Sequence, residues 1–162
     1  QVTLQDGVWV AELRGLAQSL QQKIGESYMP TCAAELGDAR CGVNVAALTE
    51  TGTVDAIVSR TSFTVTGLSA QSDDHWAKGL VNFTSGQNSG LKIEVKSWVE
   101  SSKTLELYFP VGFELASGDT FTVYPGCDKL LATCRDKFSN VINFRGFPSI
   151  PTDDQVRRVP DA

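Results

Sequence analysis

Six short segments between residues 51 and 124 alternate apolar and polar side chains, and this pattern constrains the fold more than any other feature of the chain. In residues 91–99, for example, leucine, isoleucine and valine alternate with lysine and glutamate, which predicts a strand with one buried face. Clusters of Gly, Ser, Asn and Asp separate the segments and favour turns. The predicted strands are Thr53–Val58, Phe63–Thr66, Leu80–Thr84, Leu91–Val99, Thr104–Phe109 and Thr120–Tyr124. Their spacing is typical of an antiparallel meander, which closes into a small barrel or folds into a sandwich.

The segments on either side of these strands have a different character. Residues 8–13 alternate like a strand, residues 16–24 have helical spacing that Gly25 ends, and residues 127–138 predict a second short helix with Asp128 near its start. We therefore predict a mainly β fold with a small antiparallel barrel-like domain and flanking short helices. The expected organisation is a strand, helix and first cysteine loop in residues 1–50, the barrel-like unit in 51–124, a second cysteine segment packing back on the first in 125–150, and an exposed tail in 151–162.

Charge and hydropathy exclude several classes of function. The chain has 162 residues, with 19 acidic against 14 basic side chains and a net charge of −5, so nothing attracts nucleic acid. No apolar run approaches the ~20 residues that a membrane-spanning helix needs. Because the sequence opens on Gln1 and at once alternates, we expect it to be part of a longer polypeptide.

Four cysteines form two close pairs on either side of the predicted strands. Eight residues separate Cys32 from Cys41, and six separate Cys127 from Cys134. Spacing alone leaves four possibilities open: two disulfides, a zinc site, an iron–sulfur cluster, or four free buried thiols. The usual zinc knuckle has two to four residues between paired ligands, whereas clusters accept wider spacings because each thiolate binds a different iron.

The neighbours of the cysteines slightly favour an anionic cluster. Arg40 and Arg135 each adjoin a cysteine, and guanidinium groups compensate thiolate charge. Catalytic chemistry has little support, because His75 is the only histidine and no Gly-x-Ser-x-Gly motif accompanies it. We therefore predict no catalytic residues and no enzyme.

Several motifs make the chain resemble a known family. Residues 126–129 read Gly-Cys-Asp-Lys, 132–135 read Ala-Thr-Cys-Arg, and 143–148 read Asn-Phe-Arg-Gly-Phe-Pro. With Pro-Thr-Cys at 30–32, the segment 36–43 and the segment 11–16, they resemble the C-terminal portion of phage and gene-transfer-agent tail-tip hub proteins over about residues 7–151. The order of the cysteines is also similar to that of the tail-tip L proteins of lambda-like phages. Those proteins carry additional cysteines around the third ligand, whereas this chain has four in total.

The resemblance implies a cofactor and its ligands. It implies an iron–sulfur cluster of the [4Fe–4S] type, or alternatively zinc, held by Cys32, Cys41, Cys127 and Cys134. We also expect at least one of four arginines to lie near the cysteines or to hold the loop 143–148; these are Arg14, Arg40, Arg135 and Arg145.

The resemblance further implies a structural role in a virion. The chain would join the distal tail to the central fibre or baseplate proteins at the tail tip, as a homotrimer assembled in the cytoplasm of the bacterial host. The alternative functions are a small iron–sulfur redox or electron-transfer module and a zinc-stapled structural domain.

Overall fold

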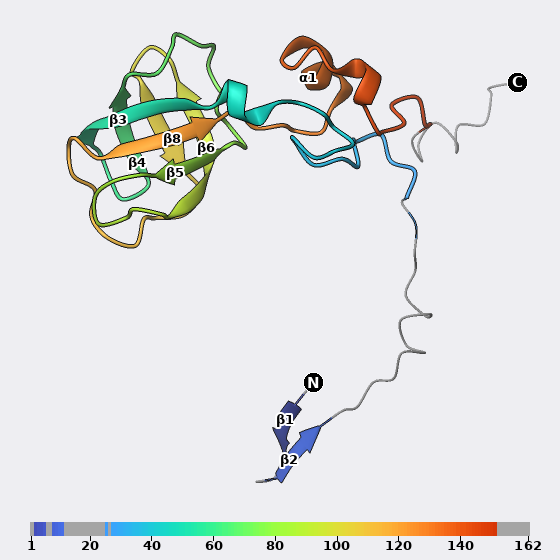
Figure 1. The fold of residues 1–162 in the computed structure, drawn as a ribbon, viewed down its shortest axis with the longest axis horizontal. Coiled ribbons are helices and arrows are strands. Elements are labelled where there is room, and N and C mark those ends of the chain that lie inside the picture. The colour runs from blue at the N-terminus through green and yellow to red at the C-terminus, as the bar shows by residue number, and fades with distance from the viewer. Residues whose placement is uncertain (1, 6–7, 12–24, 26, 152–162) are drawn as a thin grey trace, which may run out of the picture.

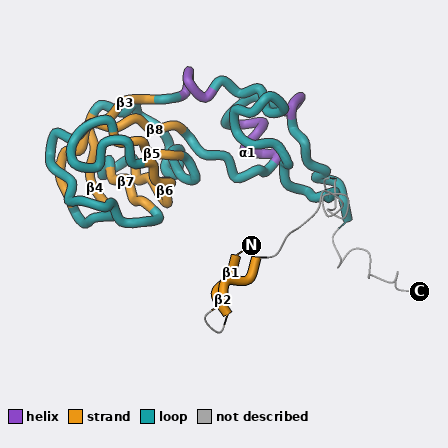
Figure 2. The backbone as a smooth tube through the Cα atoms, turned by 60° about the horizontal axis from the view of Figure 1, so that its bottom comes forward, coloured by secondary structure: helices purple, strands orange, loops and turns teal. Residues whose placement is uncertain are grey.

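The computed structural model describes residues 2–5, 8–11, 25 and 27–151. The predicted helix 16–24, Arg14 and nearly all of the tail 151–162 lie outside the described residues. Near the N-terminus, β1 (Val2–Gln5) and β2 (Val8–Ala11) form an antiparallel hairpin, so the strand predicted in residues 8–13 is present over residues 8–11, and residues 12–13 lie outside the described residues. The rest consists of a β-barrel and a smaller region of loops and short helices (Figures 1 and 2).

Six antiparallel strands close into the barrel, which confirms the mainly β prediction and selects the barrel over the sandwich. All six predicted strands are present, with ends that differ by up to three residues. They are β3 (Glu50–Ile57), β4 (Ser62–Thr66), β5 (Leu80–Phe83), β6 (Lys92–Val99), β7 (Thr104–Leu107) and β8 (Thr120–Tyr124).

The order of the strands differs from the predicted meander. Around the barrel the order is β3-β4-β7-β6-β5-β8, so β4 pairs with β7 and not with β5, and β8 pairs with both β3 and β5. The connection between β4 and β5 is long, and its Trp76 is buried in the core. Because the local pattern fixes which face of a strand is buried but not which strand lies beside it, alternation alone could not show this order.

Aromatic side chains fill the interior of the barrel. Phe63, Phe83 and Phe121 are almost fully buried, with ring centroids 5.9–6.2 Å apart and tilted or edge-to-face rings. Trp98 and a layer of valines and leucines complete a single core. Burial of three phenylalanines and two tryptophans gives this barrel the apolar area that a stable small domain needs.

The described residues outside the barrel and the hairpin form what we call the cysteine lobe, residues 27–44 and 125–151. It contains α1 (Leu131–Asp136) and the 3-10 helix η3 (Val141–Asn143), while η2 (Val45–Leu48) leads from the lobe into β3. The helix predicted over 127–138 is therefore shorter. Asp128 does not cap α1, because its carboxylate accepts from Leu130 N–H at 2.9 Å and from the Thr133 hydroxyl at 2.8 Å, and residues before Leu131 are not helical.

Lobe and barrel meet at a close backbone contact. A Cβ on Gly126 would lie 2.0 Å from the carbonyl carbon of Lys78, and a Cβ on Gly79 would lie 1.9 Å from the carbonyl oxygen of Tyr124. Only glycine fits at either position, so the chain leaving β8 runs directly against the chain entering β5. This contact fixes where Cys127 begins relative to the barrel.

Candidate functional site

The structure brings the two cysteine segments together. Cys32 N–H donates to the carbonyl of Lys129 at 2.8 Å, and Ala33 N–H donates to the carbonyl of Arg145 at 3.2 Å. On the other side of the lobe, Asn140 Nδ2 donates to the carbonyl of Cys41 at 2.6 Å. The first cysteine loop is therefore bound to the second by hydrogen bonds at both ends.

All four cysteines are free thiols, with Cys134 buried and the other three half-buried. Burial raises the pKa of the Cys134 thiol, and the neighbouring Cys127, Cys32 and Cys41 raise it further. Burial also raises the pKa of Cys127, which the backbone N–H and the charge of Lys129 partly oppose. The four thiols are thus close enough to interact electrostatically.

Hydrogen bonds to sulfur surround the group. The backbone N–H of Arg145 donates to Cys32 Sγ at 3.3 Å, and that of Lys129 donates to Cys127 Sγ at 3.4 Å. Cys134 instead donates its Sγ–H to the carbonyl of Asn140 at 3.3 Å. N–H donors of this kind stabilise anionic sulfur ligands and tune the metal that they bind.

The four-cysteine metal centre expected from the sequence is not present as a site for a single ion. Among residues 2–5, 8–11, 25 and 27–151, no group of three or more His, Cys, Asp or Glu side chains is placed to hold one metal ion. A tetrahedral zinc with bonds of about 2.3 Å would need sulfurs only about 3.8 Å apart. An iron–sulfur cluster sets a different requirement, because each sulfur binds its own iron. The cofactor and its four ligands stay predictions.

The guanidinium groups of the two arginines that adjoin cysteines, Arg40 and Arg135, bind oxygen atoms. Arg40 donates to the carbonyl of Ala33 at 2.9 Å, within the first cysteine loop. Arg135 pairs with Asp136 at 2.7 Å on an exposed turn, and charge compensation by Arg135 stays a prediction. Arg145, one of the four arginines expected near the cysteines, does lie beside Cys32, which it contacts through its backbone N–H.

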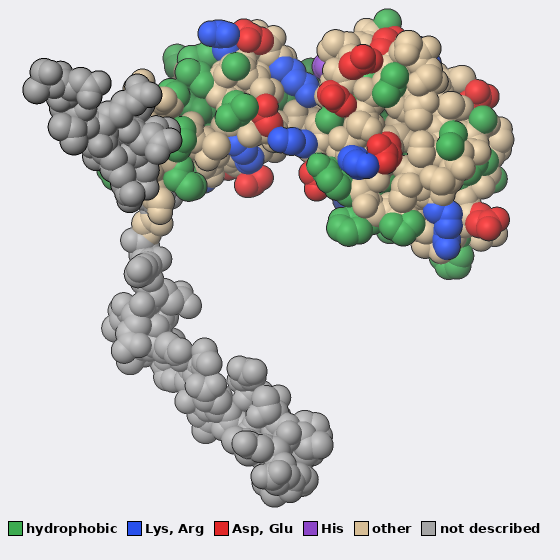
Figure 3. All heavy atoms as spheres, turned by 180° about the vertical axis from the view of Figure 1, so that it is seen from behind, with side chains coloured by type: hydrophobic (Ala, Val, Ile, Leu, Met, Phe, Trp, Pro, Cys, Tyr) green, Lys and Arg blue, Asp and Glu red, His purple; other side chains and the backbone are tan. Residues whose placement is uncertain are grey.

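The lobe has almost no apolar core. Among its described residues, the buried apolar side chains are Ala34, Pro125 and Cys134, and none of them belongs to the core cluster of the barrel. Larger apolar side chains face outward, and Figure 3 shows hydrophobic surface on the lobe. They are Tyr28, Met29, Leu130, Val141, Ile142, Phe147 and Ile150. Hydrophobic burial therefore contributes little to holding the lobe together.

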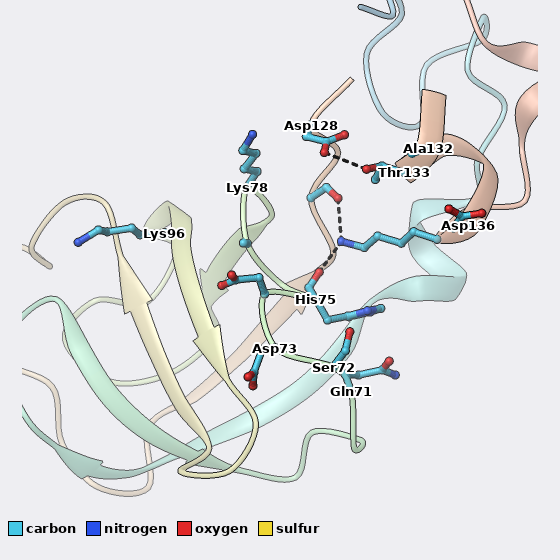
Figure 4. Close-up of a pocket in the computed structure, with 14 residues that line it drawn as sticks. Gln71, Ser72, Asp73, His75, Lys78, Lys96, Asp128, Ala132, Thr133 and Asp136 are labelled. Carbon is cyan, nitrogen blue, oxygen red and sulfur yellow. Dashed lines mark hydrogen bonds between the residues drawn. The ribbon is translucent and has the colours of Figure 1, made fainter. Parts of the chain in front are cut away.

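A groove of about 820 Å³ lies where the lobe meets the barrel (Figure 4). His75 lines it, half-buried and edge-to-face with Trp76 at 4.7 Å between ring centroids. Burial lowers the pKa of His75, and the nearby charge of Lys137 lowers it further. The Nζ of Lys137 donates to the carbonyls of His75 and Gly126, which joins α1 to the barrel.

Several charged groups of this groove make internal bonds. Asp73 accepts from Glu100 N–H at 2.8 Å, Asp74 accepts from Trp98 N–H at 3.2 Å, and Lys96 pairs with Glu106 at 2.8 Å. Asp128 accepts from Thr133, as Figure 4 shows. These bonds, with those from Lys137 to the carbonyls of His75 and Gly126, give the groove a structural role.

Sequence reasoning missed two residues that organise the site, Lys137 and Asn140. Asn140 lies inside the distinctive C-terminal block, but its partner Cys41 is 99 residues away in the chain. Lys137 follows α1 and has no local pattern that separates it from a surface lysine. No signal in a single sequence would have found either contact.

The family model described as "Phage conserved hypothetical protein BR0599" matches residues 74–154, which is half of the chain. The chain belongs to this phage family. A second model, described as "Baseplate hub protein, N-terminal attachment domain", matches residues 1–44 of this BR0599 family member. No curated protein matches it significantly.

Among solved structures, this BR0599 family member is similar to a chain of the "Virion of native gene transfer agent (GTA) particle". The two share 33% sequence identity with a TM-score of 0.69, over 99% of this chain and 57% of the other. This chain thus spans little more than half the length of that relative. The likeness confirms the resemblance to phage and gene-transfer-agent proteins. It also agrees with the prediction of a structural protein and not an enzyme. The similarity to lambda-like L proteins stays a prediction. No helix in the described part is long and apolar enough to span a membrane.

Proposed function

We propose that this chain is a structural part of the baseplate hub at the tip of a phage-type tail. The observation that carries this proposal is the similarity over nearly the whole chain to a component of a gene-transfer-agent virion, with the hub attachment model matching residues 1–44. In this role the chain joins the distal tail to the central fibre, as three copies around the tail axis, after assembly in the host cytoplasm. The exposed apolar side chains of the lobe support contacts with neighbouring tail proteins.

Purified particles test the structural role. We expect the chain among the proteins of purified tails, with an antibody against the barrel labelling the tail end distal to the capsid. Abundant chain in the host lysate together with its absence from purified particles would contradict the proposal.

We further propose that a [4Fe–4S] cluster holds the lobe together through Cys32, Cys41, Cys127 and Cys134. Two features support it: the lobe has almost no apolar core, and its two hydrogen-bonded segments carry four free thiols, two of which accept a backbone N–H. When bound, the cluster supplies four iron–thiolate bonds that connect the segments. Since an unfolded chain has no preformed site, metal binding then stabilises the folded lobe.

Analysis of protein purified without oxygen tests the cofactor. We expect about four irons and four sulfides per chain, with a broad visible absorption band that Cys41→Ser abolishes. Ser89→Ala in a barrel loop is the control and leaves the iron content unchanged. One zinc and no iron per chain would reject the cluster and support a zinc ion that holds the lobe together. Neither metal in such material would reject both the cluster and the zinc site.

A further inference from the structure

Asn140 contacts one cysteine from each pair. Its Nδ2 donates to the carbonyl of Cys41 at 2.6 Å and lies 3.7 Å from Cys41 Sγ. Its backbone carbonyl accepts from Cys134 Sγ–H at 3.3 Å, and its backbone N–H donates to the carbonyl of Cys134 at 2.9 Å. A single half-buried residue thus joins Cys41 to Cys134 across the lobe.

A second asparagine fixes the orientation of this amide. Asn143 Nδ2 donates to Asn140 Oδ1 at 2.7 Å, which leaves Asn140 Nδ2 directed at Cys41. A donor from Asn143 therefore makes the flipped amide unfavourable, because its NH₂ group would then face another NH₂ group. The Asn140 side chain is set by this contact before any ligand binds.

The donor to Cys41 differs in kind from the other donors to sulfur. Cys32 and Cys127 receive N–H bonds from the backbone of Arg145 and Lys129, which any residue at those positions could supply. The donor to Cys41 Sγ is a side-chain amide, whereas the donors to Cys32 Sγ and Cys127 Sγ are backbone N–H groups. The contact with Cys41 therefore depends on the identity of residue 140.

We propose that Asn140 is a positioning residue for the cluster: its backbone N–H, bonded to the Cys134 carbonyl, and its amide, bonded to the Cys41 carbonyl, hold the two cysteines together, and the amide also donates an N–H to the Cys41 sulfur. The bond from Cys134 Sγ–H belongs to the metal-free protein, because a thiolate ligand has no proton to donate. This inference rests on the proposed function. A donor to a ligand sulfur favours the more negatively charged, reduced state of a cluster, so its loss lowers the reduction potential. Asn140 touches no iron and acts through the two cysteines.

Three variants separate the donor from the charge. Asn140→Leu removes the donor without adding charge, and Asn140→Asp removes it and adds a carboxylate. Asn44→Asp is the matched control, because Asn44 is exposed near the same cysteine segment and uses only its side-chain oxygen, to accept from Ala47 N–H. We expect Asn140→Leu to lower the equilibrium constant for cluster reduction about tenfold, which is about 59 mV for a one-electron couple, and Asn140→Asp to lower it further because its carboxylate adds negative charge beside the sulfur. Asn44→Asp should leave it unchanged.

Thiol labelling of the metal-free, reduced protein gives a second measurement that needs no cluster. We expect Asn140→Leu to raise the rate of iodoacetamide labelling at Cys41 severalfold over the rates at Cys32, Cys127 and Cys134, measured by mass spectrometry of each peptide, because the variant loses the side-chain bonds to Cys41 but keeps the backbone bonds to Cys134. An equal rise at all four cysteines would assign Asn140 a general folding role and overturn the inference, as would an unchanged potential in iron-containing Asn140→Leu. If wild-type protein contains no iron, the proposed cofactor is rejected. Labelling of the metal-free protein then still tests whether Asn140 positions the cysteines.

Discussion

Replacing Lys137 by methionine should release the cysteine lobe from the barrel without unfolding the barrel. Lys137 caps the C-terminal end of α1, where its N–H donates to the carbonyl of Thr133 at 3.0 Å. Its ammonium group donates to the carbonyl of Gly126 at 2.9 Å and to that of His75. Methionine has a similar length and retains the apolar contacts of the side chain, so the change removes chiefly the two donated bonds.

The size of the effect follows chiefly from the bond to His75, which joins the lobe to the barrel, because the bond to Gly126 lies within the lobe. A hydrogen bond to a charged group contributes about 1.5–3 kcal/mol. Burial opposes part of this gain, because it lowers the pKa of Lys137, and water in the open groove can reach the freed carbonyls. We therefore expect a net loss of about 2 kcal/mol for lobe docking, which raises the population of the detached lobe about 30-fold.

Hydrogen exchange with mass spectrometry measures this population. Peptides covering 131–139 should exchange about 30-fold faster in Lys137→Met, whereas peptides of β6 and β7 should not change. Lys96→Met is the matched control, because Lys96 lines the same groove but pairs with Glu106 within the barrel. Unchanged exchange in 131–139, or equal acceleration in lobe and barrel, would refute the assigned role of Lys137.

Two further predictions concern the barrel and its response to pH. Asn88→Ala should lower the free energy of unfolding by about 2–3 kcal/mol in urea titrations. The Asn88 side chain is only 3% exposed and makes two hydrogen bonds to the backbone of Phe113, at 3.0 and 2.9 Å. A loss under about 0.5 kcal/mol would contradict this prediction. The lowered pKa of folded His75 means that the unfolded chain binds the proton first as the pH falls, so wild-type stability should decrease between the ordinary histidine pKa of about 6.5 and the lower folded value. His75→Gln should remove this part of the pH dependence in thermal melts, and an identical pH profile in both proteins would count against it.

The sequence was most informative where structure is local. Alternation located all six barrel strands, because each strand must bury one face and this requirement is written in its own residues. The strand order could not be predicted in the same way, since the pairing of β4 with β7 depends on the path of the long connection through Trp76.

The candidate site shows the same division. The cysteines stand out by residue type, and their pairing in sequence indicated two segments that meet. The groups that orient them are less visible, because the donors to Cys32 and Cys127 are backbone N–H groups and the Asn140 contact spans 99 residues. Such contacts arise only once both segments have folded against each other.

The pairing of β3 with β8 places the two ends of the barrel side by side. Glu50 lies opposite Val123, so the chain enters and leaves the barrel at neighbouring positions. In the gene, the coding region of the barrel therefore lies between the coding regions of the two segments that form the cysteine lobe. Recombination that exchanged the coding region between Thr49 and Pro125 would give the chain a different domain at this place, while the hydrogen bonds joining Cys32 to Lys129 and Cys41 to Asn140 stayed in place. The contacts of Lys137 with His75 would be lost and would have to be rebuilt by the incoming domain.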